Sequence, residues 1–170
     1  KTELDLLRES VPVIASYGNY AASGGYWISA NTDKIFSNAT TLTGSIGVFS
    51  MIPDVSGALK NKLHVNVTTV NSNAHSDLYS LIKPLDAAET AYMQASVENI
   101  YERFTSIVAE GRDMTVEAVD AIAQGRVWTG AEAEGIGLVD QIGTLSDALD
   151  YAAISIDGVE GIKDVQIVEY

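Results

Sequence analysis

Residues 18–29 read GNYAASGGYWIS and place a single serine, Ser23, between two alanines and two glycines. The apolar run VPVIASY precedes this stretch, and residues 21–30 have a helical composition. A strand turning into a helix here would put Ser23 at the first helical turn, where free backbone N–H groups and the helix dipole favour negative charge. Two interpretations remain open at this point. Ser23 is either a capping serine in a tightly packed turn or a nucleophile that a substrate backbone can approach closely.

Working outward from this stretch, short apolar runs alternate with segments of helical pattern. Strands are predicted at 12–17, 34–38, 46–50, 64–70, 137–140 and 164–170, and the ATTLTGS segment between the second and third of these is predicted as a turn. Helices are predicted at 54–62, 87–110 and 144–155, with two more starting near Thr115 and Thr129, and residues 1–10 resemble the last turns of an amphipathic helix. This alternation indicates an α/β fold.

The helix at 87–110 has the clearest pattern. One apolar stripe is formed at spacings of three and four residues by Met93, Val97, Ile100, Phe104 and Ile107. Asp86 and Glu89 have the spacing of a capping box, and Gly111 is a natural stop. Thr129 and Glu132 repeat the capping-box spacing at a shorter predicted helix.

Composition narrows the possible functions. The 170 residues suffice for one domain with a real core, and 46% of them are hydrophobic. The net charge of −13 disfavours binding to nucleic acid or to an anionic membrane surface. No cysteine occurs, which rules out disulfides and thiolate metal sites, and no apolar run approaches the roughly 20 residues that span a bilayer. We expect no metal and no cofactor.

A nucleophilic serine needs a base, because its free hydroxyl reacts poorly at neutral pH. The two histidines, His64 and His75, lie at a predicted strand start and in a polar loop, with no orienting partner at an obvious spacing. Lysine is the alternative base, provided that burial lowers its pKa. The six lysines all lie in polar segments or at element ends, so the residues alone do not identify a base.

Two segments carry a family resemblance. The stretch from Gly18 to Ser50, with AASGGYWIS and TLTGSIGV, closely resembles the nucleophile region of the signal peptide peptidase A (protease IV) family, and RVWTGAEAEGIGLVDQIG resembles its C-terminal signature. The resemblance covers about residues 10–155 and implies a ClpP/crotonase-like α/β superhelix. It implies that Ser23 is the nucleophile, that the Gly24 N–H is an oxyanion donor, and that Ser45 orients a catalytic lysine.

The resemblance also implies a Ser–Lys dyad, and here the chain departs from the pattern. The position that matches the lysine of single-copy members is Ser76, with Lys83 as a fallback further along the loop. Long members carry the lysine in a first copy of the fold and the serine in a second, so we expect residues 1–170 to be one peptidase domain, the second copy. A Gly-Gly turn that would supply another oxyanion donor is expected to precede Lys1, as are the first copy and a membrane anchor.

The resemblance further implies the biological setting. The substrates would be cleaved signal peptides, the partners would be the first copy and further copies of the same protein, and the location would be the bacterial cytoplasmic membrane with the catalytic domain facing the periplasm or outside. Three alternatives are weighed against it. A Clp-type protease would need a histidine where Val48 stands, a crotonase-type enzyme would bind acyl-CoA thioesters with site carboxylates, and a scaffold half would only support assembly.

Overall fold

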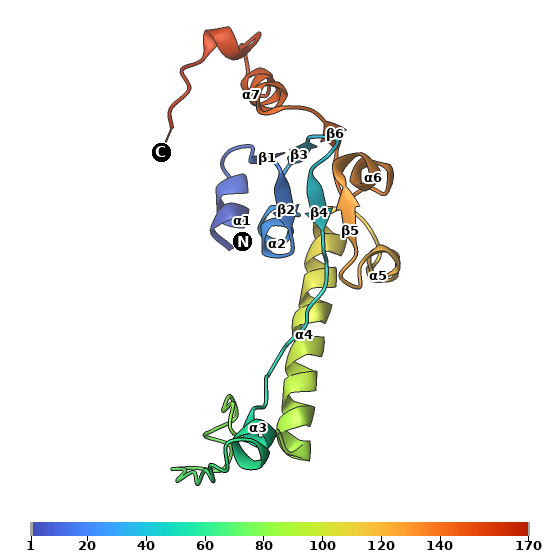
Figure 1. Ribbon diagram of the computed structural model, residues 1–170. Helices are drawn as coiled ribbons and strands as arrows, with labels where there is room; N and C mark the ends of the chain where they lie inside the picture. Colours follow the sequence, from blue (N-terminus) through green and yellow to red (C-terminus); the bar gives the residue numbers. More distant parts are fainter. Residues whose placement is uncertain (1, 170) are drawn as a thin grey trace. The chain divides into compact units, whose positions relative to one another are not determined.

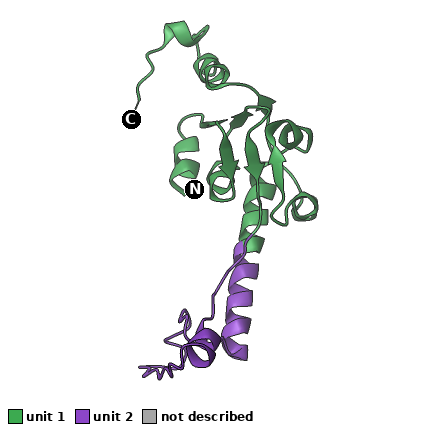
Figure 2. Cartoon of the chain, viewed as in Figure 1, with its two compact units in different colours: residues 1–47, 101–170 green, residues 48–100 purple. Residues whose placement is uncertain are grey.

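The computed structural model describes residues 2–169 and contains both helices and short strands (Figure 1). The chain forms two compact units, one of residues 1–47 with 101–170 and one of residues 48–100 (Figure 2). Lys1 and Tyr170 lie outside the described residues. The unit of residues 1–47 with 101–170 is called unit 1, the unit of residues 48–100 is called unit 2, and each is described by itself. The α/β class predicted from the alternation is confirmed for the described residues.

Unit 1 holds two small sheets. In the first, β1 (Ile14–Tyr17), β3 (Lys34–Ser37) and β6 (Gln141–Ile142) run parallel in the order β1-β3-β6. In the second, β2 (Tyr20–Ala22) pairs in parallel with β4 (Leu42–Gly44), which pairs antiparallel with β5 (Val127–Thr129). The second sheet positions Ser23, because β2 ends immediately before it.

The helices of unit 1, seen in Figure 1, are α1 (Thr2–Arg8), α2 (Gly24–Ser29), α5 (Val116–Ile122), α6 (Gly130–Gly135), α7 (Leu145–Ile154) and the short 3-10 helix η1 (Ile162–Asp164). Of these, α2, α6 and α7 pack against the strands. The last part of α4 (Ala87–Gly111) also belongs to this unit. Its buried side chains Phe104 and Val108 join Tyr26, Ile46 and Leu138 in one apolar core. Trp27 of α2 packs on Phe104 with ring centroids 4.6 Å apart.

A partly buried ion pair links three parts of unit 1. Arg112, just after α4, binds Asp140 at 2.6 Å between Nη2 and Oδ1 and donates from Nε to the Gly137 carbonyl. Asp140 also accepts from the Ile35 N–H of β3 at 2.7 Å. Burial alone would raise the pKa of Asp140, but the hydrogen bonds from Arg112 and Ile35 outweigh it and lower the pKa.

Unit 2 contains α3 (Ser56–Asn61) and the first part of α4. The capping box predicted for α4 is confirmed, because Glu89 N–H donates to Asp86 and Asp86 N–H donates to Glu89. Of the expected stripe, Phe104 and Ile107 are buried in the core of unit 1, Met93 and Val97 are half-buried, and Ile100 is exposed. No helix within residues 2–169 is long and apolar enough to cross a membrane.

Four strand predictions are wrong. Residues 46–50 and 64–70 form no strand, since neither segment has a partner strand among the described residues, and the second is exposed throughout. Residues 137–140 bury Leu138 and Val139 without joining a ladder, and β6 begins only at Gln141. Residues 165–169 are also without strand structure, and Tyr170, the last residue of that prediction, lies outside the described residues.

The three strands of the second sheet were missed by the sequence pattern. β2 lies where a helical segment was expected to start, the segment expected as a turn contains β4, and β5 lies where only a helix start was predicted. The helix predictions at 54–62, 87–110, 144–155, near Thr115 and near Thr129 are confirmed within a few residues. The Thr129–Glu132 capping box is also present.

Candidate active site

Ser23 stands at the turn between β2 and α2 in an unusual backbone conformation. Its φ of 53° and ψ of −116° lie outside the regions that residues with a Cβ normally occupy. Two backbone hydrogen bonds hold the turn: the Ser23 N–H donates to the Gly44 carbonyl at 2.9 Å, and the Trp27 N–H donates to the Ser23 carbonyl at 2.8 Å. Strain of this kind costs of order 1–3 kcal/mol and persists only where surrounding structure enforces it.

The side chain of Ser23 is exposed and makes no capping hydrogen bond to α2. Of the two interpretations left open by the sequence, the structure shows no capping bond from Ser23, and the role of Ser23 as a nucleophile stays a prediction. A capping serine would accept from an N–H of the first turn, as Thr115 does at α5. The conformation instead projects the hydroxyl outward at a sharp strand-to-helix turn, which is how nucleophilic serines are presented in α/β hydrolases.

Gly24 and Gly25 open α2 and are both exposed. A Cβ added to either would meet no heavy atom within 4 Å, and neither has a positive φ. Neither internal packing nor backbone conformation therefore requires glycine at these positions. Because the first N–H groups of a helix have no intrahelical acceptor and the Ser23 side chain does not cap them, the Gly24 N–H is available to a ligand oxygen.

Two buried tyrosine hydroxyls hold helix α2 in place. The buried Tyr26 hydroxyl donates to the Leu138 carbonyl at 2.8 Å, and the Tyr17 hydroxyl lies 2.5 Å from Ser29 Oγ. Burial raises the pKa of Tyr17 to about 12 and raises that of Tyr26 further. Both phenols therefore remain protonated at neutral pH and hold the helix that follows Ser23.

Ser45 lies next to Ser23, although 22 residues separate them in sequence. Ala22 pairs with Gly44, so the two serines directly follow the last paired residues of adjacent parallel strands. Ser45 is half-exposed and has a φ of 48°, a left-handed conformation that costs a residue with a Cβ about 1–2 kcal/mol. The structure therefore brings together Ser23, Gly24 and Ser45 within unit 1.

Lys83 belongs to unit 2, where two carboxylates hold it. Its Nζ lies 2.8 Å from Asp77 Oδ1 and 2.7 Å from Glu89 Oε1. These hydrogen bonds, first to Asp77 and then to Glu89, raise the pKa of Lys83. A lysine base needs the opposite shift, towards neutrality. Ser76, at the position matched to the family lysine, is an exposed turn residue.

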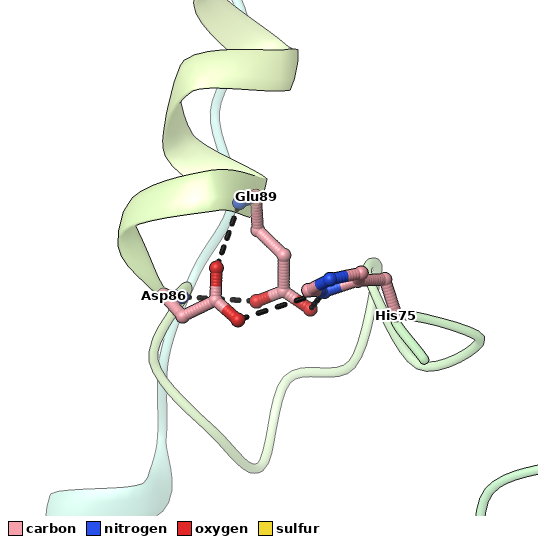
Figure 3. Close-up of side chains that lie close together, drawn as sticks. All are labelled: His75, Asp86 and Glu89. Atoms are coloured by element: carbon pink, nitrogen blue, oxygen red, sulfur yellow. Dashed lines mark hydrogen bonds and ion pairs between the residues drawn. The ribbon is translucent and has the colours of Figure 1, made fainter. Parts of the chain in front are cut away.

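His75, Asp86 and Glu89 are the one group of three described residues with the residue types and spacing of a metal site, and Figure 3 shows them facing one another. His75 Nδ1 lies 3.1 Å from Glu89 Oε1 and 3.5 Å from Asp86 Oδ2. Glu89 already accepts from Lys83 through Oε1 and from the Asp86 N–H through Oε2. The ammonium of Lys83 thus supplies the positive charge here, and the group serves as the cap of α4.

His64 does not open a strand as predicted. It is an exposed residue with a φ of 53°. Both histidines belong to unit 2, where His75 is hydrogen-bonded to Glu89.

An exposed serine on a strained strand-to-helix turn, inside an α/β fold, is the arrangement in which serine hydrolases present their nucleophile. Sequence comparison narrows this class. The chain matches peptidase family S49 over residues 5–157, and it belongs to that family.

Three relatives illustrate the similarity. The chain is 44% identical over 142 residues to Protease 4 of Salmonella typhi, covering 84% of this chain and 23% of that protein. It is 41% identical over 160 residues to a protein of Enterococcus faecium provisionally named signal peptide peptidase SppA, covering 94% and 45%. It is 37% identical over 151 residues to the chloroplastic serine protease SPPA of Arabidopsis thaliana, covering 88% and 22%. The chain therefore spans less than half the length of each of these relatives.

Proposed function

We propose that this chain is the serine-bearing part of a serine peptidase that works through an acyl-enzyme. The observation that carries the proposal is the exposed, uncapped hydroxyl of Ser23 on its strained turn. In the reaction, Ser23 Oγ attacks the peptide carbonyl carbon and gives its proton to a lysine base. The base then protonates the departing amine, and water releases the acyl group in a second step.

The residues around Ser23 have defined roles in this proposal. The Gly24 N–H stabilises the oxyanion, since it is free at the start of α2. Ser45 accepts a hydrogen bond from the lysine and fixes the direction of its amine. The lysine comes from the first copy of the fold in a longer polypeptide, because Lys83 is committed to Asp77 and Glu89.

The substrates we propose are apolar, extended peptides such as cleaved signal peptides. Support comes from the exposed side chains of the sheet that ends at Ser23. Tyr20 and Leu42 are register partners on β2 and β4, and Val127 lies on β5 opposite Gly44. Their relative exposures are 76%, 37% and 53%, so apolar surface is open to a ligand beside the site.

The wider setting follows from the same family. We propose a single peptidase domain over residues 1–170 that has the ClpP/crotonase-like superhelix fold and assembles with the first copy and with further copies. A membrane location facing the periplasm or outside would match a signal-peptide substrate. The competing proposal, a non-catalytic scaffold half, would leave the strain at Ser23 without a purpose.

The test is Ser23→Ala in the full-length protein, assayed on an apolar peptide. We expect peptide hydrolysis to fall by at least about 1000-fold, because a covalent nucleophile is lost. Ser146→Ala, which removes an exposed hydroxyl on α7, is the matched control and should keep full activity. Activity of Ser23→Ala within about tenfold of wild type would refute the assignment.

A further inference from the structure

The segment 124–128, QGRVW, lies against Ser45 and is not explained by the chemistry above. The Ser45 N–H donates to the Arg126 carbonyl at 2.8 Å, and the Gly125 N–H donates to the Ile46 carbonyl at 2.9 Å. These bonds continue the antiparallel β4–β5 ladder past the pair Gly44–Val127. Ser45 thus adopts its left-handed conformation where its backbone is hydrogen-bonded to a segment about 80 residues further along the chain.

Residues 44–47 and 124–128 lie so close together that no additional side-chain atom fits between them. A Cβ on Gly47 would lie 2.6 Å from the Cα and N of Gly125. A Cβ on Gly44, whose φ is 73°, would lie 2.9 Å from Trp128 Cδ1 and 3.3 Å from the Arg126 carbonyl oxygen. Glycine is needed at both positions for the backbones to approach this closely.

The other side of the segment is tied to the end of α5. The guanidinium of Arg126 donates from Nη1 to the carbonyls of Ala121 at 2.9 Å and Ala123 at 3.2 Å. Trp128 Nε1 donates to the Ile122 carbonyl at 3.0 Å. A cation on the last carbonyls of a helix is favoured by both hydrogen bonding and the helix dipole.

From these contacts we propose that Arg126 is a positioning residue for the peptidase reaction and acts through Ser45. Its side chain is fixed on the end of α5, its carbonyl oxygen accepts from the Ser45 N–H, and the Ser45 hydroxyl is thereby aimed at the lysine. The inference rests on the proposed function, in which Ser45 accepts from that lysine. Without the Arg126 side chain, the segment loosens and Ser45 relaxes away from its left-handed conformation.

The test is a double-mutant cycle in the full-length protein with Arg126→Met and Ser45→Ala, measured by kcat, KM and the pH–rate profile. Arg126→Met should lower kcat about 3- to 30-fold, with KM changed less than about twofold. The Ser45→Ala, Arg126→Met double variant should be no slower than Ser45→Ala alone, within about twofold, because the arginine acts through the serine. Additive losses would overturn the proposal.

The pH–rate profile separates positioning from simple loss of charge. Loss of an oriented acceptor destabilises the protonated lysine, so the acidic limb should move to lower pH in Arg126→Met, as in Ser45→Ala. Loss of a nearby positive charge would instead stabilise the protonated lysine and move the limb to higher pH. An acidic limb of Arg126→Met that moves to higher pH, or that stays at the wild-type pH, would overturn the proposal.

Two further variants guard against a folding defect. Trp128→Phe removes the hydrogen bond from Trp128 to the Ile122 carbonyl of α5, and should lower kcat less than Arg126→Met does. Arg103→Met, at an exposed arginine of α4, should have the kcat of wild type. If Ser45→Ala proves harmless while Ser23→Ala is inactive, this proposal and the role of Ser45 fail, and the assignment of Ser23 as the nucleophile stands. If Ser23→Ala stays active, the proposed function fails as well.

Discussion

At the scale of single residues, the turn at Ser23 depends on hydroxyls that the reaction itself would not use. Thr43 is fully buried and donates from Oγ1 to the Ala21 carbonyl at 2.7 Å, two residues before Ser23. Thr41 likewise donates a hydrogen bond from Oγ1 to the Gly18 carbonyl at 2.5 Å. Each threonine fixes the path of the chain into the strained turn.

Thr43→Val should therefore destabilise the protein while keeping the shape of the side chain. The expected cost is about 0.5–1.5 kcal/mol of unfolding free energy, the usual net contribution of one hydrogen bond. Thr43→Ser retains the hydroxyl and should retain a competent turn, although it loses a methyl group. Urea denaturation measures both variants, and a Thr43→Val protein as stable as wild type would contradict the role of this bond.

Ser45→Ala should slow peptide hydrolysis about 10- to 1000-fold without unfolding the protein, which corresponds to about 1–4 kcal/mol of transition-state stabilisation. The ammonium formed on the lysine has three donors, and the loss of the Ser45 oxygen leaves one of them without its acceptor. Because the protonated lysine is destabilised, its pKa falls and the acidic limb of the pH–rate profile moves to lower pH. Unchanged rate and unchanged limb together would make Ser45 a turn residue only.

At the scale of elements, α4 illustrates how a polar cap can be sensitive to acid. Hydrogen bonds from Lys83, from the Asp86 N–H and from His75 lower the pKa of Glu89 from 4.5 to about 2. A carboxylate whose pKa is lower in the folded state stabilises the fold above its unfolded pKa. That contribution is lost as the pH falls from about 4.5 through about 2.

Glu89→Gln should consequently weaken the dependence of stability on acid. The wild-type urea midpoint should fall between pH 7 and pH 3, and the fall should be smaller in Glu89→Gln, whose side chain does not titrate. Glu102→Gln, on an exposed position of the same helix, is the control and should behave like wild type. Equal pH dependence in the Glu89 variant would show that the cap does not contribute in this way.

The ion pair of Arg112 and Asp140 makes a second prediction at this scale. Asp140→Ala leaves a guanidinium that is only 8% exposed without its carboxylate, and it also removes the acceptor of the Ile35 N–H. Breaking one side of a buried pair typically costs about 3–5 kcal/mol. Thermal unfolding should show a loss of this size, and a loss below about 1 kcal/mol would mean that water replaces the pair.

Elements also differ in how well their sequence predicts them. Helix α4 is predictable because its period, capping box and terminal glycine are all local features. Strands β2, β4 and β5 have three residues each and are defined by partners up to 87 residues away, as in the pair Leu42–Thr129. Composition and period contain no information on such pairing, which is why β4 was expected as a turn and 64–70 as a strand.

At the scale of the whole molecule, the site could be predicted only in part. The small-residue setting of Ser23 and the family resemblance identified Ser23, Gly24 and Ser45 as candidates. The adjacency of Ser23 and Ser45 follows from the parallel β2–β4 pairing, and the contact with Arg126 follows from the β4–β5 ladder. The signal that could have revealed the latter is a pair of glycines, Gly47 in the first resembling segment and Gly125 directly before the second.

The proposed origin of the lysine base in the first copy predicts the behaviour of the isolated chain. Purified residues 1–170 should not turn over a peptide ester, because Lys83, the fallback base within this chain, is paired with two carboxylates. The full-length protein, assayed beside it, should be active. Robust turnover by residues 1–170 that disappears in Lys83→Met would contradict the split and identify Lys83 as the base.

The most direct test of the central claim, that Ser23 is a nucleophile, is covalent labelling of the full-length protein with a fluorophosphonate, followed by peptide mapping by mass spectrometry. A fluorophosphonate modifies serines activated for acyl transfer, so exposure without activation does not suffice. We predict one adduct, on the peptide that contains Ser23, and its loss when the protein is first unfolded in urea. An adduct on a different serine, or no adduct on a protein that hydrolyses peptides, would contradict the account.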